Sequence, residues 1–216
     1  MKTTLHLIIA AFGLAAFNLS RGDDLTTLSL PAGLTNLQSC DLAGNQLTTL
    51  SFPSDLTTLR NLDLDWNPLI DVSSLSGQTS LRGLSLRNTG LTNLILLSGL
   101  RNLKYLDLNG NPLTLLVLPE PVVGAVCPPI EDLRNQGVAV YVYPLETRLI
   151  AEHQSSVGTF RFTLAGPPGS YRVQITADFS SWADLDAVTN VNGSAEFTDS
   201  SAGLRARSFY RVKMER

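Results

Sequence analysis

Residues able to carry metal or nucleophilic chemistry are few and widely separated in this sequence. The chain of 216 residues contains two histidines: His6 in an apolar N-terminal segment, and His153 without a cysteine or second histidine at ligand spacing. A zinc site requires about three or four such ligands. The sequence also lacks the G-x-S-x-G, H-E-x-x-H and Walker motifs. We therefore expect no enzymatic activity, no metal site and no cofactor.

Two acidic residues near the C-terminus, Glu196 and Asp199, are candidates for glycoside chemistry, which uses paired carboxylates in a cleft. Both are expected to reach solvent, but nothing in the sequence places them opposite a substrate. Tyr171, Phe179 and Trp182 offer a different kind of site, an aromatic platform for a sugar. Core packing is the favoured interpretation of these three rings, because aromatic side chains dominate small β cores.

The dominant pattern is a motif of eleven places, L-x-x-L-x-L-x-x-N-x-L. Its copies begin every 22 residues, at Leu37, Leu59, Leu81 and Leu103. Leucines at places 1, 4, 6 and 11 do not sustain a 3.6-residue period, which excludes amphipathic helices. The central L-x-L is instead predicted to form a short strand whose leucines face inward. One unit cannot bury its apolar row alone, so the copies must stack into a solenoid with a continuous core.

Place 9 of the motif holds a polar residue where the chain must bend after the strand. It is Asn45, Asn67 and Asn111 in three copies and Thr89 in the third copy. An amide there can bond to backbone groups that the turn exposes inside the coil. Threonine offers fewer hydrogen bonds, so we expect a looser turn at Thr89.

The second half of each unit also repeats. Residues 25–31 (L-T-T-L-S-L-P) match residues 47–53 (L-T-T-L-S-F-P) at the same spacing. Because proline disfavours an α-helix, these second halves, which form the convex side of the solenoid, are predicted to be extended or 3₁₀. On these motifs, residues 25–118 resemble the leucine-rich repeats of secreted bacterial proteins, including those of internalin-like build. Similar repeat arms bind unrelated ligands, so the resemblance does not identify the partner.

The N-terminus has two interpretations. Met1 and Lys2 precede a largely apolar run over 5–17, and a small-x-small site at 20–22 precedes Asp23, which predicts a signal peptide over 1–22. The run is too short for a membrane-spanning helix, which needs about 20 apolar residues. Alternatively, Leu14, Phe17 and Leu19 imitate the opening of a repeat 23 residues before Leu37, as in a degenerate first coil.

The chain changes character after the fourth copy. Residues 130–137 are predicted to form a short helix closed by Gly137, and 138–143 a strand, which together cap the last coil. From 147, about six short β segments separated by turns predict a small antiparallel β-sandwich. The expected fold is thus a mostly β, α/β-type solenoid over 23–144, with parallel strands on its concave face, followed by the sandwich over 147–216.

The two cysteines are expected to be free. Cys40 occupies place 4, an inward core position, and Cys127 lies beyond the fourth copy. Strands about 4.8 Å apart put these coils at least ~14 Å from one another, whereas a disulfide needs Cα atoms within ~7 Å. Cysteine usage therefore neither supports nor contradicts export.

The remaining candidate site is the concave face, formed by side chains at places 3, 5 and 7 of the motif. It carries acidic residues together with an aromatic ring and an arginine, and Trp66 at place 8 borders it. Aromatic and arginine side chains are common hot spots of interfaces, although carboxylates at place 5 can also serve only to solvate the strands. The predicted partner-binding residues are Asn61, Asp63, Asp65, Trp66, Ser85, Arg87, Tyr105, Asp107 and Asn109.

The sequence favours a secreted or cell-surface binding protein for a protein or glycan partner. A net charge of −3 and a pI near 5.3 give none of the basic excess of nucleic-acid binders. A monomer is expected, without a membrane span. The alternative is a structural or adhesive protein of the cell envelope, with the sandwich as its attachment module.

Overall fold

The computed structural model describes residues 3–5, 15–19, 25–96, 98–151 and 158–215. The chain divides into two compact units, Met1–Val140 and Tyr141–Arg216. Most of the apolar N-terminal run, the predicted processing site, His6 and His153 lie outside the described residues. Within the described part of the chain, no helix is long and apolar enough to cross a membrane.

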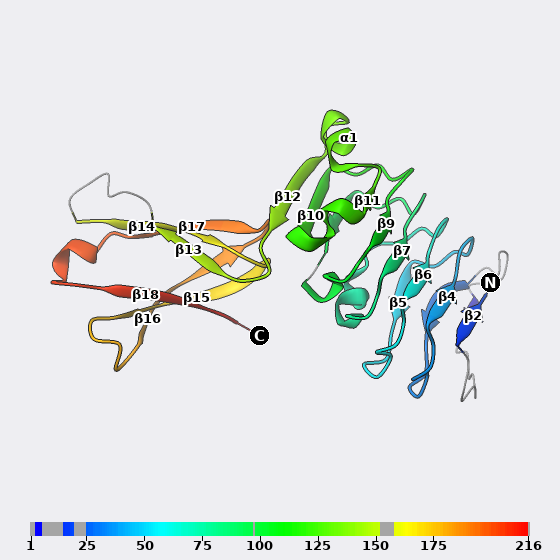
Figure 1. The fold of residues 1–216 in the computed structure, drawn as a ribbon, viewed down its shortest axis with the longest axis horizontal. Coiled ribbons are helices and arrows are strands. Elements are labelled where there is room, and N and C mark those ends of the chain that lie inside the picture. Colours follow the sequence, from blue (N-terminus) through cyan, green and yellow to red (C-terminus); the bar gives the residue numbers. More distant parts are fainter. Residues whose placement is uncertain (1–2, 6–14, 20–24, 97, 152–157, 216) are drawn as a thin grey trace. The chain divides into compact units, whose positions relative to one another are not determined.

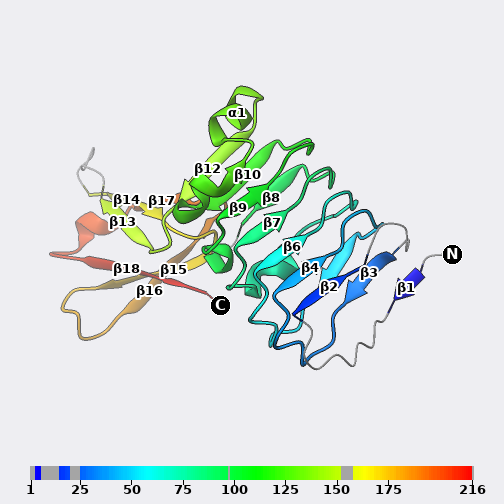
Figure 2. The ribbon, with the colours of Figure 1, turned by 45° about the vertical axis from the view of Figure 1, so that its right-hand side comes forward.

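The first unit is built on a six-stranded parallel sheet in which each strand comes from a successive coil (Figure 2). Each motif forms the predicted short strand, which covers places 3–5 and so begins one residue before the central L-x-L. Neighbours pair in register, for example Cys40 with Leu62 and Leu62 with Leu84. The strands in spatial order are β2 (Ala16–Asn18), β4 (Ser39–Asp41), β6 (Asn61–Asp63), β7 (Gly83–Ser85), β9 (Tyr105–Asp107) and β11 (Val126–Cys127).

The other side of the coils is extended or 3₁₀, as the proline positions predict. Two three-stranded parallel sheets lie there: β1 (Thr3–Leu5), β3 (Leu25–Ser29) and β5 (Thr49–Ser51), then β8 (Asn93–Ile95), β10 (Leu115–Pro119) and β12 (Ala139–Tyr143). The 3₁₀ segments are η1 (Ser73–Gly77), η2 (Ser98–Leu100) and η3 (Glu120–Ala125).

The core between the two sides is a leucine column that continues from coil to coil. Leu62, Leu84 and Leu106 at place 4 are at most 2% exposed, and the leucines at places 1 and 6 are equally buried. Cys40 replaces leucine in this column, and burial, with a smaller effect of the Asp41 carboxylate, raises the pKa of its thiol to about 12. It therefore stays a neutral, small apolar group. Both cysteines are free, as predicted.

Both ends of the solenoid carry covering elements. At the N-terminal end, β2 pairs with β4, Phe17 opposite Cys40, at the 23-residue offset of the degenerate first coil. At the other end, α1 (Ile130–Asn135) ends before Gly137, which has a left-handed φ of 90°, and β12 follows. This helix and strand were predicted as the C-terminal cap.

The C-terminal module contains two three-stranded antiparallel sheets (Figure 1). One has the order β13 (Arg148–Ala151), β14 (Phe160–Ala165), β17 (Ser194–Asp199), and the other β16 (Ala183–Asn190), β15 (Gly169–Thr176), β18 (Phe209–Met214); η4 (Ala202–Leu204) precedes β18. Phe162, Leu164 and Phe197 from the first sheet and Tyr171 and Val173 from the second form one shared core. The predicted strands and their antiparallel arrangement are thus present.

The expectation that three aromatic rings pack in this core is right for one of them and wrong for two. Tyr171 is fully buried, and its hydroxyl donates to the Pro167 carbonyl at 2.7 Å. Phe179 is 60% exposed and Trp182 is half-buried, and both lie outside the core cluster. The reason is that both rings belong to the connection between β15 and β16, past the ends of the strands that enclose the core.

Candidate functional site

The six-stranded sheet presents a hollow on its concave face. Along each strand the middle residue points into the core, and its neighbours at places 3 and 5 point away, as the burial of Asn61, Leu62 and Asp63 shows. The hollow has a volume of about 320 Å³. Its lining includes Ser39, Asp41, Asn61, Asp63, Gly83, Ser85 and Tyr105.

Gly83 opens this hollow in the middle of the face. It holds place 3 between Asn61 and Tyr105, so the column lacks a side chain at its centre. A Cβ atom built at Gly83 would lie 2.8 Å from the Asn61 side-chain oxygen. The glycine therefore leaves room for the Asn61 side chain, whose amide oxygen lies over this position.

The floor of the hollow is acidic. One oxygen of each carboxylate is held by the backbone: the amide of Ala43 donates to Asp41 Oδ1, and the amide of Asp65 to Asp63 Oδ1, both at 3.0 Å. Burial raises the pKa of Asp63, and the nearby carboxylates raise it further against that hydrogen bond. Among ion pairs between described residues, none neutralises Asp41 or Asp63.

Asp107 is buried beneath its neighbours on the concave face and holds their side chains in place, so it does not itself contact a partner. It is only 3% exposed, and its carboxylate accepts hydrogen bonds from the Tyr105 hydroxyl at 2.8 Å and from the Asn109 side-chain amide at 2.7 Å. Arg87 lies 3.8 Å from the same carboxylate. The hydrogen bond to Asp107 raises the pKa of Tyr105. Asp107 thus orients three neighbouring side chains from below, which corrects its prediction as a residue that contacts the partner.

Asp65 joins two coils. Its Oδ1 accepts hydrogen bonds from the Ser85 hydroxyl and, at 2.8 Å, from the backbone amide of Arg87. The Arg87 side chain remains 51% exposed, and Tyr105 is 48% exposed. The residues that present open surface to a partner are therefore Asn61, Arg87 and Tyr105, with Trp66 beside them.

Trp66 is held in an unusual backbone conformation. Place 8 has a positive φ in every copy of the motif: 71° at Gly44, 58° at Trp66, 51° at Asn88 and 74° at Gly110. Glycine adopts this region freely and asparagine tolerates it, but for other residues it costs about 1–2 kcal/mol. Trp66 is 56% exposed, so core packing does not account for its presence. Glycine at place 8 of two copies, Gly44 and Gly110, is the signal in the sequence for this backbone constraint, which the spacing of the leucines alone did not predict.

The place 9 side chains bond to backbone groups within the coils. Asn67 Oδ1 accepts from the Leu47 amide at 3.0 Å, while its Nδ2 donates to the carbonyls of Leu42 and Leu64, each at 3.0 Å. Asn45 and Asn111 make the same two kinds of donation to carbonyls of their own and the preceding coil. These residues shape the turns beneath the concave face and do not contribute to its surface.

The carboxylates considered for glycoside chemistry do not form a catalytic pair. Asp199 is 4% exposed and accepts hydrogen bonds from Tyr210 at 2.8 Å and Arg205 at 2.6 Å. Burial raises its pKa, but hydrogen bonds from Ser201, Tyr210 and Arg205 outweigh this and lower the pKa to about 2. The expectation that both Glu196 and Asp199 reach solvent is therefore wrong for Asp199. Among the described residues, no group of three His, Cys, Asp or Glu side chains is arranged to hold a metal ion.

The comparison with known protein families agrees with this architecture. The leucine-rich repeat family model matches residues 36–59 and 102–122, which contain the first and fourth motif copies. The chain therefore contains leucine-rich repeats at these two places, and the parallel strands between them continue the same coil pattern. No curated protein matches the chain.

Proposed function

We propose that this chain is a secreted, non-enzymatic binding protein whose concave face recognises a protein partner. The observation that carries the proposal is Trp66, an exposed aromatic residue kept at a left-handed backbone position where two other copies have glycine. Strain of this kind persists where a function depends on the side chain. Tryptophan, tyrosine and arginine are also the residue types most often found as hot spots.

The mechanism is recognition by a surface that is ordered before binding. The carboxylates of Asp41 and Asp63 are held by backbone amides, and Asp107 orients Tyr105 from below. A partner therefore orders few side chains when it binds, and less conformational entropy is lost. The acidic floor favours a partner that presents a basic side chain to the hollow, because electrostatic complementarity speeds association and selects partners.

The cellular setting is part of the proposal. The basic start and apolar run support export to the extracellular space or cell surface. The resemblance of the motifs in residues 25–118 to internalin-like repeats supports a bacterial surface protein. A glycan ligand for the concave face and an adhesive role at the envelope are the alternatives. Recovery of the protein from culture supernatant favours the binding protein, whereas a salt-extractable envelope fraction favours the adhesive role.

A capture experiment tests the binding surface. Immobilised full-length chain is exposed to extracellular proteins and to glycans, beside a variant carrying Trp66→Gly, Arg87→Ala and Tyr105→Ala. The matched control changes exposed residues away from places 3, 5 and 7: Ile95→Ala, Arg101→Ala and Glu120→Ala. We expect a protein to be captured by the wild type and the control but not by the concave-face variant. Equal capture by all three chains would place the site elsewhere and reject the proposal.

A further inference from the structure

The outer face of the sheet β16-β15-β18 in the C-terminal module carries a second organised surface. On β15 and β18, Tyr171, Val173 and Val212 point into the core, so the residues between them point outward. The register places Arg172 beside Lys213 and Gln174 beside Arg211. Asp184, from β16, is paired with Gln174 on the other side. The outward side chains of three strands therefore form one continuous polar row.

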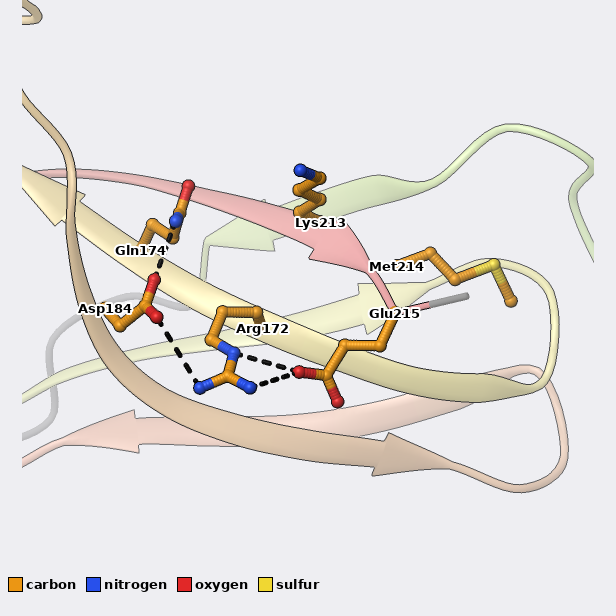
Figure 3. Close-up of a pocket in the computed structure, with 6 residues that line it drawn as sticks. All are labelled: Arg172, Gln174, Asp184, Lys213, Met214 and Glu215. Carbon is orange, nitrogen blue, oxygen red and sulfur yellow. Dashed lines mark hydrogen bonds and ion pairs between the residues drawn. The ribbon is translucent and has the colours of Figure 1, made fainter.

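Hydrogen bonds fix the orientation of this row, as Figure 3 shows. The Arg172 guanidinium donates to Glu215 Oε1, at 2.9 Å from its Nε, and lies 3.5 Å from Asp184 Oδ2. The Gln174 amide donates to Asp184 Oδ1 at 2.7 Å. On the other strand, Arg211 Nε donates to Gln174 Oε1 at 2.8 Å. Planar donors and acceptors thus lie exposed but already oriented, as a polar ligand requires.

An aromatic cluster closes one end of the row. Phe209 lies on the same face of β18 as Arg211, two residues away, and its ring centroid is 4.0 Å from that of Phe179. The Trp182 ring lies edge-on to Phe179 at 6.2 Å, and the Arg211 guanidinium lies 4.2 Å from its centroid. Phe179 is 60% exposed and has a left-handed φ of 65°, so its ring is presented to solvent at a backbone cost.

The charge of this surface indicates which ligand it suits. A hollow of about 690 Å³ lies over the row, lined by Arg172, Gln174, Asp184, Lys213, Met214 and Glu215. Two basic and two acidic side chains in this lining cancel, and hydrogen-bond donors alternate with acceptors. Arg211, outside the lining, adds one positive charge to the row, and its guanidinium is engaged by Gln174 and the Trp182 ring. An anion such as a phosphate or nucleic acid gains little from a balanced surface, because its binding depends on an excess of basic groups. A neutral ligand rich in hydroxyl groups can use donors and acceptors equally.

We infer that this face of the C-terminal module binds a neutral oligosaccharide. Hydroxyl groups of the sugar exchange hydrogen bonds with Arg172, Gln174 and Asp184, and the apolar face of a sugar ring packs on the exposed Phe179 ring. From Phe209 to Lys213 the row is about 14 Å long at a rise of ~3.4 Å per residue, which suits a chain of sugars better than one. The inference concerns a second surface and does not depend on the proposed role of the concave face.

The chain offers a specific reporter for the experiment. It contains two tryptophans, so a Trp66→Gly variant retains Trp182 as its one indole. In this background, tryptophan fluorescence is titrated with cellohexaose, chitohexaose, xylohexaose and mannohexaose, and with heparin as the anionic comparison. Arg172→Ala combined with Gln174→Ala tests the row. Arg161→Ala is the matched control, an exposed arginine of the other sheet that bonds across strands to Thr198 at 3.2 Å.

At least one neutral hexasaccharide is expected to shift the Trp182 emission. Its dissociation constant should be at least tenfold larger in the double variant and unchanged in the control. Because exposed ion pairs contribute little to stability, the double variant should melt near the parent temperature. Three outcomes overturn the inference: no response to any neutral sugar in either fluorescence or calorimetry, equal affinity in the double variant, or binding of heparin alone.

Discussion

Asn111 Oδ1 accepts three hydrogen bonds from the coil before it, two of them from Thr89: 3.0 Å from the Thr89 amide and 2.8 Å from its hydroxyl. The third comes from the Leu91 amide at 3.2 Å. The Thr89 hydroxyl oxygen also lies 3.0 Å from the Leu86 carbonyl, which corresponds to the carbonyl that asparagine Nδ2 contacts in its own coil. Threonine has no second side-chain N–H or O–H that could donate to a carbonyl of the preceding coil. The loss of hydrogen bonds expected at threonine is thus real, and Asn111 compensates for part of it.

This relationship predicts unequal costs along the place 9 column. Asn67→Ala removes an acceptor for the Leu47 amide and donors for two buried carbonyls, so we expect a loss of roughly 1–3 kcal/mol in the free energy of unfolding. Thr89→Ala removes one hydroxyl and should cost less. Urea unfolding measures both. An Asn67→Ala chain as stable as the wild type would show that water replaces these bonds.

Trp66 is expected to contribute to partner binding while lowering the stability of the fold. Trp66→Gly restores the residue found at the equivalent Gly44 and Gly110, so the free energy of unfolding should stay the same or rise by about 1 kcal/mol while capture of the partner is lost. Trp66→Ala also lacks the ring but keeps a Cβ at positive φ, and it should be less stable than the glycine variant. Thermal unfolding compares the two. A large destabilisation by glycine would instead assign Trp66 a structural role.

Asp199 should give the C-terminal module an acid-dependent stability. Its folded pKa of about 2 lies below the unfolded value of ~3.9, so its contribution is complete above about pH 5 and is lost as the pH falls toward 2. The contribution is about 2–3 kcal/mol, since one unit of pKa corresponds to about 1.4 kcal/mol. Asp199→Asn should be less stable at neutral pH and should lose this step in urea unfolding between about pH 5 and pH 2. A step of unchanged size would assign it to other carboxylates.

The N-terminal coil should stabilise the first full repeat. The Leu19 amide donates to the Asp41 carbonyl at 3.0 Å, the Leu19 carbonyl accepts from Asn45 at 3.2 Å, and Phe17 packs against the core. A chain beginning at Asp23 loses these contacts and should melt at a lower temperature than the full chain. Phe17→Ala in the full chain should reproduce part of the loss. Equal melting of full and shortened chains would show that the solenoid can end at β4, as processing at residue 22 would require.

The repeat arm was open to prediction because its determinants are local and periodic. A 22-residue spacing places Leu62, Leu84 and Leu106 in one column whatever the rest of the chain does, since each coil pairs with its sequence neighbour. The position of a residue in the motif likewise predicted whether its side chain points into the core or away from it. The short strands of the C-terminal module followed from β-forming segments between turns in the same way.

Other features depend on contacts between coils or between strands distant in sequence. Asp107 belongs to an outward place, yet Tyr105, Asn109 and Arg87 cover it, because three flexible side chains converge on one carboxylate. Phe179 and Trp182 are aromatic, as core residues often are. Because β15 ends before them, both rings lie outside the core of the C-terminal module. The spacing of leucines determined the solenoid through nearest-neighbour pairing, whereas the exposure and ionisation of its polar residues were decided by neighbours that no single repeat contains.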